Sequence, residues 1–358
     1  MQKNARFLIL AASFLMPLIA IHAAAPEKVE ANQVKEIPLV SSKAYENPFM
    51  EVELDAVVTR PDGKQLRVPA FWAGGNDWKF RYASELTGTH SWKTECKDAT
   101  NTGLHGISGT SEVVPSASDN PLYKHGPVRF SENKHAFEHA DGTPFFWLGD
   151  TWWKALCRRL PWEGFQELAA DRQKKGFTVA QIVCGTYPDE PGLLKPSWEN
   201  EGGMPYLAQD FSKMNPEYFN YTDRRLQHLV ETGLAPVIVG AWGRGDCNSM
   251  QAIGLEGLKR HWLYLIARYA AYPVFWILAG EVPESTKRNE GPWAPLAQYV
   301  RSLDPFRRPL TCHTGHGRHA VKDATVVLDF DMVGGNHDQN AAIQPQTVGI
   351  VSSAYSKE

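Results

Sequence analysis

The chain has 358 residues, of which 43% are hydrophobic and 22% are charged, and its formal net charge is −3. This is an ordinary globular composition, and the length favours two domains. The mildly acidic balance argues against a nucleic-acid partner, and no block of like charges indicates a disordered tail.

Residues 1–24 have the composition of a secretory signal peptide. Lys3 and Arg6 precede an apolar run at 7–21, and small residues follow at 23–25. The run is too short to span a bilayer, so we expect cleavage near its end and a secreted or periplasmic protein. No later segment is long and apolar enough to serve as a membrane anchor.

Alternating apolar and polar residues between 33 and 118 predict an antiparallel β-sandwich domain of the immunoglobulin type. The expected strands include MEVELDAVVTR, QLRVPAFWAG, DWKFRYAS and HSWKTECK, and the turn PDGK separates the first two. Short alternating strands broken by Gly and Asp turns are typical of such a sandwich. A linker rich in Pro, Ser and Asn follows, from about residue 115 to residue 127.

From residue 128 to residue 358, predicted strands alternate with predicted helices. The strands are TPFFWLG, FTVAQIVC, LAPVIVG, PVFWILAG, RPLTCHTG and TVVLDFDMVG, and amphipathic helices such as WEGFQELAADRQKKG separate several of them. This alternation predicts a parallel α/β fold. No glycine-rich phosphate loop follows the first strand, so a nucleotide-binding fold is disfavoured. We expect a (β/α)8 TIM barrel of which about six strands are present.

Polar and aromatic residues follow each predicted strand, where the functional groups of a TIM barrel lie. Sugar hydroxyls need hydrogen-bond partners, sugar rings lie on aromatic faces, and glycosidic cleavage uses two carboxyl groups. Residues of these types on one rim therefore indicate an oligosaccharide or polysaccharide substrate. The candidate substrate-binding residues are Asp150, Trp152, Tyr187, Trp242, His313, Asn336 and His337.

Glu281 is the candidate catalytic residue. It follows the apolar run VFWILA, and Gly280 lets the backbone turn so that the carboxyl group emerges at the rim. A partly buried glutamate beside aromatic residues suits a general acid. The alternative is a surface glutamate that caps the next loop, and Glu284 competes for the same role. We expect Glu281 and Asp150 to lie at the same end of the barrel.

Several of these residues have a structural alternative. Asp150 can instead bond backbone amides or cap the next helix. Trp242 and Tyr187 fit core packing as well as they fit sugar platforms. The loop at 185–215 is too long for a routine connection, so we expect it to form a wall of the substrate site.

The run TCHTGHGRH spaces His313, His316 and His319 three residues apart. Such spacing could suggest a metal site. Gly315 and Gly317 break any helix that would bring the histidines to one face. We therefore expect no metal and no other cofactor, and His313 fits a pocket residue better.

Together these motifs resemble one known family. DGTPFFWLGDTWW is similar to the opening signature of the apiosidase-like glycoside hydrolases, whose catalytic domain is a (β/α)8 barrel. ENPFMEVELDAVVTRPDGKQLRVPAFW, followed by WKFRYASELTGTHSWKTE, is similar to the β-sandwich that often precedes such barrels in secreted bacterial enzymes. The resemblance covers nearly the whole chain after the predicted signal peptide.

The resemblance implies a retaining layout, with an acid/base after the fourth strand and a nucleophile after the seventh. The family's Gly-Gly-acid pattern corresponds to Ala279, Gly280 and Glu281, so the acid/base role carries over to Glu281. Gly280 departs from the Asn that the broader clan usually has at this point. Asp150 matches the family's acid after the first strand, and His337 matches a histidine after the sixth.

The family's nucleophile lies in an Asn-Gly-Glu-Pro-like motif on the seventh strand, and the final run TVGIVSSAYSKE contains no such motif. We therefore expect a barrel that is truncated at its C-terminus, with the nucleophile beyond residue 358. The exposed edges of an open barrel argue against activity of this polypeptide alone. The prediction is a secreted glycoside hydrolase that acts on a plant- or algal-type polysaccharide. The alternative is a glycan-binding protein without catalytic activity.

Overall fold

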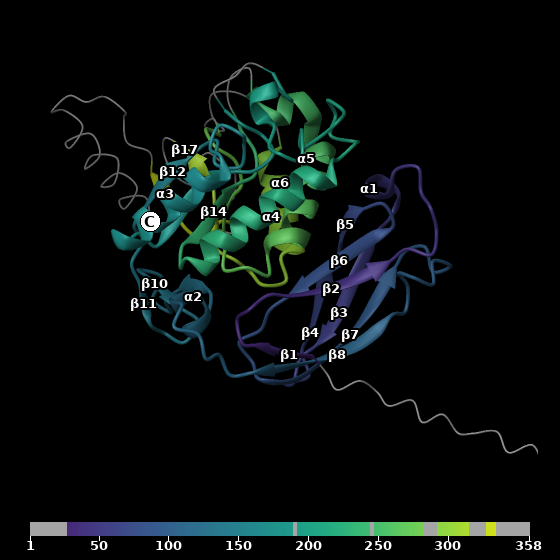
Figure 1. The fold of residues 1–358 in the computed structure, drawn as a ribbon, viewed down its shortest axis with the longest axis horizontal. Coiled ribbons are helices and arrows are strands. Elements are labelled where there is room, and N and C mark those ends of the chain that lie inside the picture. Colours follow the sequence, from purple (N-terminus) through teal and green to yellow (C-terminus); the bar gives the residue numbers. More distant parts are fainter. Residues whose placement is uncertain (1–26, 189–191, 244–246, 283–291, 315–326, 334–358) are drawn as a thin grey trace, which may run out of the picture.

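The computed structural model of the chain describes residues 27–188, 192–243, 247–282, 292–314 and 327–333 (Figure 1). Two units lie side by side: an N-terminal β-domain, residues 27–114, and an α/β domain that begins near residue 128. The predicted signal peptide, residues 1–24, lies outside the described residues. Within them, no helix combines the length and the apolar character that a bilayer crossing requires.

The β-domain consists of two sheets. The larger has the strand order β1 (Glu27–Glu30), β8 (Ser108–Val114), β7 (Gly88–Cys96), β3 (Leu54–Thr59), β4 (Gln65–Pro69). The smaller has the order β2 (Lys35–Val40), β6 (Asp77–Tyr82), β5 (Phe71–Gly74). Phe80 of β6 packs edge to face on Trp92 of β7, with ring centroids 5.3 Å apart, so the core lies between the sheets.

The β-domain differs from its prediction in two places. Strand β1 precedes the expected start at residue 33, and it runs parallel to β8 whereas the other pairs are antiparallel. Residues Pro48–Glu51 form the short helix α1 instead of the beginning of a strand. Proline fits the first turn of a helix, where its missing N–H has no partner to lose. The immunoglobulin type of the sandwich stays a prediction.

A short connection leads to the second unit. Helix α2 (Pro121–Lys124) lies within the predicted linker, and Asn120 caps it by accepting from the amide of Leu122. A small antiparallel sheet follows, with the order β11 (Pro144–Phe145), β10 (Phe137–His139), β9 (Val128–Phe130). Phe137 packs edge to face on Phe275, so this sheet lies at the amino end of the larger parallel sheet.

The α/β domain contains a parallel sheet whose strands follow one another in sequence order. The strands are β12 (Gly149–Trp152), β13 (Val179–Val183), β14 (Ala235–Val239), β15 (Phe275–Ile277) and β16 (Leu310–Thr311). Strand β17 (His313–Thr314) follows β16 closely and pairs in parallel with β18 (Met332–Val333). The parallel α/β prediction is confirmed over these strands, and closure into an eight-stranded barrel remains a prediction.

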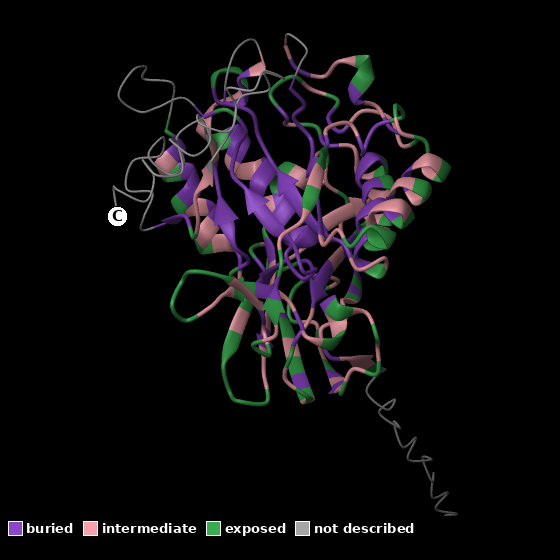
Figure 2. Ribbon diagram, turned by 90° about the vertical axis from the view of Figure 1, so that its left-hand side faces the viewer, coloured by how far each residue is buried: buried purple, intermediate pink, exposed green. Residues whose placement is uncertain are grey.

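Helices cover this sheet. They are α3 (Trp162–Lys174), α4 (Pro216–Glu231), α5 (Ser249–Tyr269) and α6 (Trp293–Leu303), and η1 (Pro196–Trp198) is a single turn. Helix α5 is interrupted at Gly254, where φ is +66°. Strand β14, with the sequence APVIV, is buried throughout because parallel strands have both faces covered. Figure 2 shows these central strands as buried and the outer helix surfaces as exposed.

The first parallel strand begins later than predicted. The run TPFFWLG was expected to form it, but Pro144 and Phe145 belong to β11, at the edge of the small sheet. Proline cannot donate to a ladder, so it is confined to edge positions of this kind. The parallel strand starts instead at Gly149, where an added Cβ would lie 2.4 Å from a methyl group of Val179. This shift changes the positions of the residues that follow.

Candidate active site

A cluster of aromatic, imidazole and carboxyl side chains lies where β12, β14, β15 and β16 end. We call it the rim cluster, and it consists of Trp153, Trp242, Glu281 and His313. Trp242 pairs with Gly280 in a parallel bridge, and the amide of His313 donates to the carbonyl of Ala279 at 3.0 Å. These backbone bonds continue the sheet beyond its named strands and fix the residues at its carboxyl end.

The packing of Trp242 explains why a glycine precedes Glu281. A Cβ added to Gly280 would lie 1.9 Å from Cζ3 of the indole, so the ring lies directly on the glycine backbone. Trp242 is 5% exposed, and its ring meets that of Trp153 at 86° with centroids 5.5 Å apart. A larger residue at position 280, such as Asn, would therefore collide with the ring of Trp242.

Glu281 combines an unusual backbone with an exposed side chain. Its φ is +49°, a left-handed value that is uncommon outside glycine and that clusters at functional sites. Its amide donates to Nδ1 of His313 at 3.2 Å, which requires Nδ1 to be unprotonated. The prediction of a partly buried Glu281 is wrong, because the side chain is exposed. The chain turns outward at this point, beyond the bridge between Trp242 and Gly280.

Trp153 joins the rim cluster, whereas Trp152, the tryptophan predicted to bind substrate, does not. Strand β12 ends at Trp152, and Trp153 is the first residue after it. Trp152 packs on Phe165 of α3, with centroids 5.7 Å apart, and is 6% exposed. The prediction of Trp152 at the rim is therefore wrong.

Asp150 is not at the rim either. It lies within β12, level with Ala180, the second residue of β13, and hence in the amino half of the sheet. Its Oδ1 accepts from Nε1 of Trp152 at 2.5 Å, and its Oδ2 accepts from Nε of Arg172 at 2.6 Å. The expectation that Asp150 and Glu281 share one end of the sheet is therefore wrong. Because β12 starts later than predicted, Asp150 falls inside the strand and bonds a helix residue.

Tyr187, a predicted sugar platform, is fully buried after β13. Its hydroxyl lies 2.5 Å from that of Tyr218 on α4, and its ring packs edge to face on Trp198 with centroids 5.5 Å apart. Burial raises the pKa of the Tyr187 hydroxyl well above its usual range. These contacts favour the core-packing alternative for Tyr187.

Four residues considered in the sequence lie outside the described residues: His316, His319, Asn336 and His337. His313 is described and belongs to the rim cluster. Within the part of the chain that the structure describes, no group of three His, Cys, Asp or Glu side chains is arranged to hold a metal ion.

The loop that was predicted to form a substrate wall is described in part, and we call residues 192–215 the rim loop. The side-chain amide of Asn215 donates to the carbonyl of Gly202 at 2.8 Å and so ties the end of the loop to its middle. The rings of Tyr206 and Phe211 stack with centroids 3.9 Å apart and an interplanar angle of 5°. The rim loop is therefore compact and has a small core of its own, as in other long functional loops.

His261 on α5 links the rim loop to the sheet. Its Nε2 lies 2.7 Å from the carbonyl oxygen of Gly240, and its Nδ1 lies 2.6 Å from the hydroxyl of Tyr206. A carbonyl only accepts, so Nε2 carries the proton and Nδ1 accepts from Tyr206. Burial lowers the pKa of His261 to about 4, which keeps the ring neutral. Nothing in the sequence of α5 around His261, which follows Lys259 and Arg260, indicated that it bonds both the rim loop and the sheet.

Two family models match the chain. The apiosidase-like catalytic domain matches residues 131–358, and a domain of unknown function, DUF5060, matches residues 28–97. The second match falls within the β-domain, and the first contains the whole rim cluster. No curated protein matches the chain.

Solved structures of similar fold come from glycoside hydrolases. A Bacteroides vulgatus protein whose proposed class is glycoside hydrolase is 23% identical, with a TM-score of 0.63, over 80% of this chain and 56% of that one. A second glycoside hydrolase is 24% identical, with a TM-score of 0.50, over 61% of this chain and 47% of that one. A family 5 glycoside hydrolase from Bacteroides vulgatus is 19% identical, with a TM-score of 0.50, over 68% of this chain and 53% of that one. At these identities the likeness shows the fold alone, and the chain spans about half the length of these proteins.

Proposed function

The chain belongs to the apiosidase-like catalytic-domain family, and from that premise we propose that it is a glycoside hydrolase with Glu281 as its general acid/base. The observation that carries the proposal is the position of Glu281, which is exposed beyond the carboxyl end of the fourth parallel strand and directly follows Gly280, the glycine on which the indole of Trp242 lies. Functional groups of parallel α/β enzymes lie at this end of the sheet.

The proposed chemistry uses Glu281 twice. The protonated carboxyl group donates its proton to the glycosidic oxygen as the bond to the anomeric carbon breaks. A second carboxylate, about 5–5.5 Å from the first in retaining enzymes, attacks that carbon and forms a glycosyl intermediate. Glu281, now a carboxylate, takes a proton from the water that hydrolyses this intermediate, which restores both groups. The described residues supply the acid/base, and no described residue is assigned as the nucleophile.

The neighbours of Glu281 have separate roles in this proposal. Trp153 is partly exposed and offers an aromatic face to a sugar ring, while the buried Trp242 supports it from behind. Nδ1 of His313 accepts a hydrogen bond from the Glu281 amide and so fixes the direction in which the Glu281 side chain points. We propose that the sheet is part of a (β/α)8 barrel, that the enzyme is secreted, and that plant- or algal-type polysaccharides are its substrates.

The proposal is tested on the full-length protein, by comparing wild type with Glu281→Gln on a set of plant and algal oligosaccharides. The measurement is the release of reducing ends, with NMR of the first product anomer to establish retention. We expect glutamine to lower the rate about 10²–10⁴-fold, because it cannot exchange the proton. The control is Glu256→Gln, an exposed carboxylate on α5 that pairs with Lys259 and that should leave the rate unchanged.

Two results would contradict this assignment. A Glu281→Gln variant as active as wild type would remove Glu281 from the mechanism. A full-length wild-type protein that binds an oligosaccharide tightly and releases no product would instead support the glycan-binding alternative, and isothermal calorimetry on the same oligosaccharides makes that distinction.

A further inference from the structure

The two domains of the chain share part of one core. Phe71 of β5 is 1% exposed and belongs to the hydrophobic core of the α/β domain. The guanidinium groups of Arg81 and Arg268 lie over its ring, at 4.9 Å and 4.7 Å from the centroid. The hydroxyl of Tyr264 on α5 donates to the carbonyl of Trp72 at 2.9 Å. The smaller sheet of the β-domain is therefore packed against α4 and α5.

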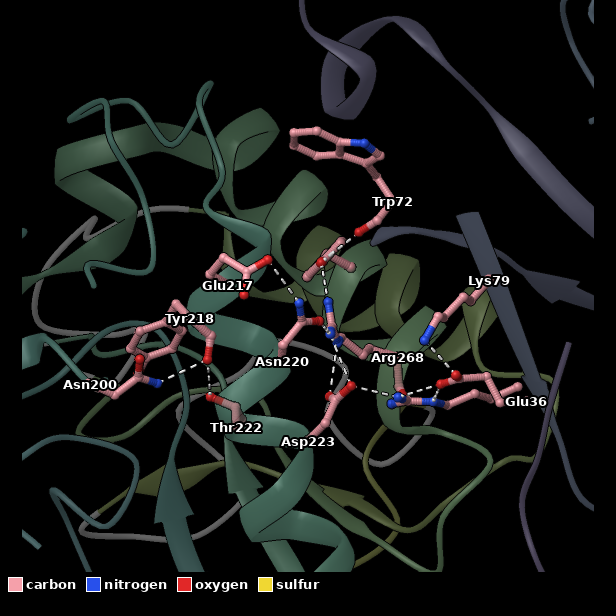
Figure 3. A network of polar contacts seen from close by, with 12 residues as sticks. Glu36, Trp72, Lys79, Asn200, Glu217, Tyr218, Asn220, Thr222, Asp223 and Arg268 are labelled. Carbon is pink, nitrogen blue, oxygen red and sulfur yellow. Dashed lines mark hydrogen bonds and ion pairs between the residues drawn. The ribbon is translucent and has the colours of Figure 1, made fainter. Parts of the chain in front are cut away.

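A polar network fixes this contact (Figure 3). Asp223 on α4 bonds Arg81 of the β-domain at 2.5 Å and Arg268 of α5 at 2.8 Å. Arg81 also donates to the backbone carbonyl of Arg268 at 2.7 Å and to Glu36 at 2.8 Å. Buried charges are tolerated when they are paired and hydrogen-bonded. Since both domains supply partners, the network sets the orientation of the β-domain relative to α4 and α5. We call it the seam network.

A second contact joins the β-domain to the rim loop. The side-chain amide of Asn47, just before α1, donates to the backbone carbonyl of Ser212 at 2.8 Å. Phe49 of α1 packs on Tyr206, with centroids 6.4 Å apart, and edge to face on Tyr264 at 5.8 Å. Ser212 and Tyr206 lie on the rim loop, so α1 contacts the loop at two separate points.

The rim loop in turn contacts the sheet below the rim cluster. Tyr206 bonds His261, and His261 donates to the carbonyl of Gly240, two residues before Trp242. A Cβ added to Gly185 would lie 2.5 Å from Cε1 of His261, so the imidazole also fills the space beside the start of the loop. A continuous set of contacts therefore runs from α1, through Tyr206 and His261, to the end of β14.

We propose that the β-domain, which matches a family of unknown function, is a positioning domain for the candidate active site. Asn47 and Phe49 are its positioning residues, and they hold the rim loop in the conformation that forms one wall of the substrate site. The seam network keeps the β-domain in place for this task. The contacts of Asn47 and Phe49 with the rim loop support the claim that the β-domain holds this loop in place. The claim that the loop then positions substrate rests in addition on the function proposed for Glu281.

Hydrogen exchange on the full chain tests the bracing without any substrate. Asn47→Asp nearly preserves the size of the side chain but cannot donate to the Ser212 carbonyl, and Phe49→Ala removes the ring. We expect both to speed exchange of the rim-loop amides roughly fivefold, since each loses one local interaction. The reporting amides are those of Leu207, Phe211 and Asn215, which donate to carbonyls within the loop.

Two control variants make the exchange result specific. Met50→Ala alters an exposed neighbour on the same helix and should leave loop exchange unchanged. Phe49→Tyr retains the aromatic ring and should restore wild-type exchange. Unchanged loop exchange in both Asn47→Asp and Phe49→Ala would overturn the proposal, and so would an equal increase throughout β13 and β14.

Kinetics on an oligosaccharide that the wild type cleaves test the consequence for the site. We expect Phe49→Ala to raise KM several-fold while kcat and the unfolding midpoint change little, because the loop positions substrate and takes no part in bond breaking. An unchanged KM in a variant whose loop exchange has increased would overturn the role in substrate positioning. Failure of the Glu281 assignment would leave the exchange result intact, so the two failures can be told apart.

Discussion

The seam network and the rim cluster use charged residues in opposite ways. In the seam network the side chains of Arg81 and Arg268 are only 5% and 1% exposed, and Asp223 lies between them. Burial alone would raise the pKa of Asp223, but Arg268 and Arg81 lower it to about 2. Every charge there has a bonded partner of opposite sign, as a buried charge requires.

In the rim cluster the carboxyl group of Glu281 is exposed, and only the backbone of this residue is fixed by a hydrogen bond. Glu281 has a left-handed φ and donates its amide to His313, while its side chain is open to solvent. A carboxylate that is buried and doubly paired is fixed in one protonation state, whereas one that exchanges protons with a substrate must be reachable. The comparison is consistent with our proposal that Glu281 at the rim takes part in the chemistry, whereas the seam network holds the two domains together.

The largest expected loss of stability comes from a substitution that disrupts the seam network. Asp223→Ala leaves two buried guanidinium groups without their shared carboxylate, and removing one partner of a buried pair costs about 3–5 kcal/mol. Urea unfolding at pH 7 measures the loss. The control is Asp171→Ala on α3, which removes an exposed carboxylate paired with Lys175 and should cost about 1 kcal/mol or less. Equal losses in the two variants would mean that the seam network contributes no more than a surface pair.

The next effect concerns His261, which lies between the two regions. Its folded pKa of about 4 is below the ordinary value of 6.5. The stability that this depression provides is fully present above pH 6.5 and is lost as the pH falls toward 4. We expect wild type to lose about 2–3 kcal/mol more than His261→Gln between pH 7 and pH 4.5, because glutamine does not titrate. Urea unfolding at both pH values measures the difference.

The matched control for His261→Gln is His135→Gln, which changes an exposed histidine in the turn before β10. That variant should keep the wild-type pH dependence. If His261→Gln also keeps it, His261 is not the group whose protonation weakens the link between the rim loop and β14.

A smaller effect tests the packing behind Glu281. Gly280→Ala places a Cβ 1.9 Å from the ring of Trp242, and overpacking of this kind costs about 1–3 kcal/mol. The ring must move, so we expect weaker oligosaccharide binding together with a lower unfolding midpoint. The control is Gly164→Ala in α3, where the nearest atom is a flexible methyl group of Leu160 at 3.3 Å. Equal behaviour of the two alanines would show that Trp242 does not depend on Gly280.

The seam network and the rim cluster also differ in how far the sequence predicted them. The apolar run before Glu281 and the glycine at 280 placed this acid at a strand end, because strand length and turn chemistry are local properties. Nothing local paired Arg81 with Asp223, which lie 142 residues apart. Such a contact depends on how two domains pack, and it has no periodic signature in the sequence.

The errors within the α/β domain have the same origin. Asp150 and Trp152 were assigned to the rim because a strand was placed at TPFFWLG, and a shift in where a strand begins changes both the end and the face that each residue occupies. For Tyr187 the sequence left the platform and the core alternatives open, because nothing near it shows that its hydroxyl bonds Tyr218 of the distant helix α4. Burial of a single aromatic residue is decided by such distant partners.

The smallest expected effect is a change in rate caused by a substitution at His313 in the rim cluster. His313→Ala removes the acceptor of the Glu281 amide, and a hydrogen bond of this type is worth about 0.5–1.5 kcal/mol. With the left-handed backbone less constrained, we expect kcat to fall about tenfold or less while KM changes little. His313→Asn is the matched variant, because its side-chain oxygen can occupy the position of Nδ1 and should recover most of the rate. Equal rates for Ala and Asn would mean that His313 acts through a contact other than the Glu281 amide.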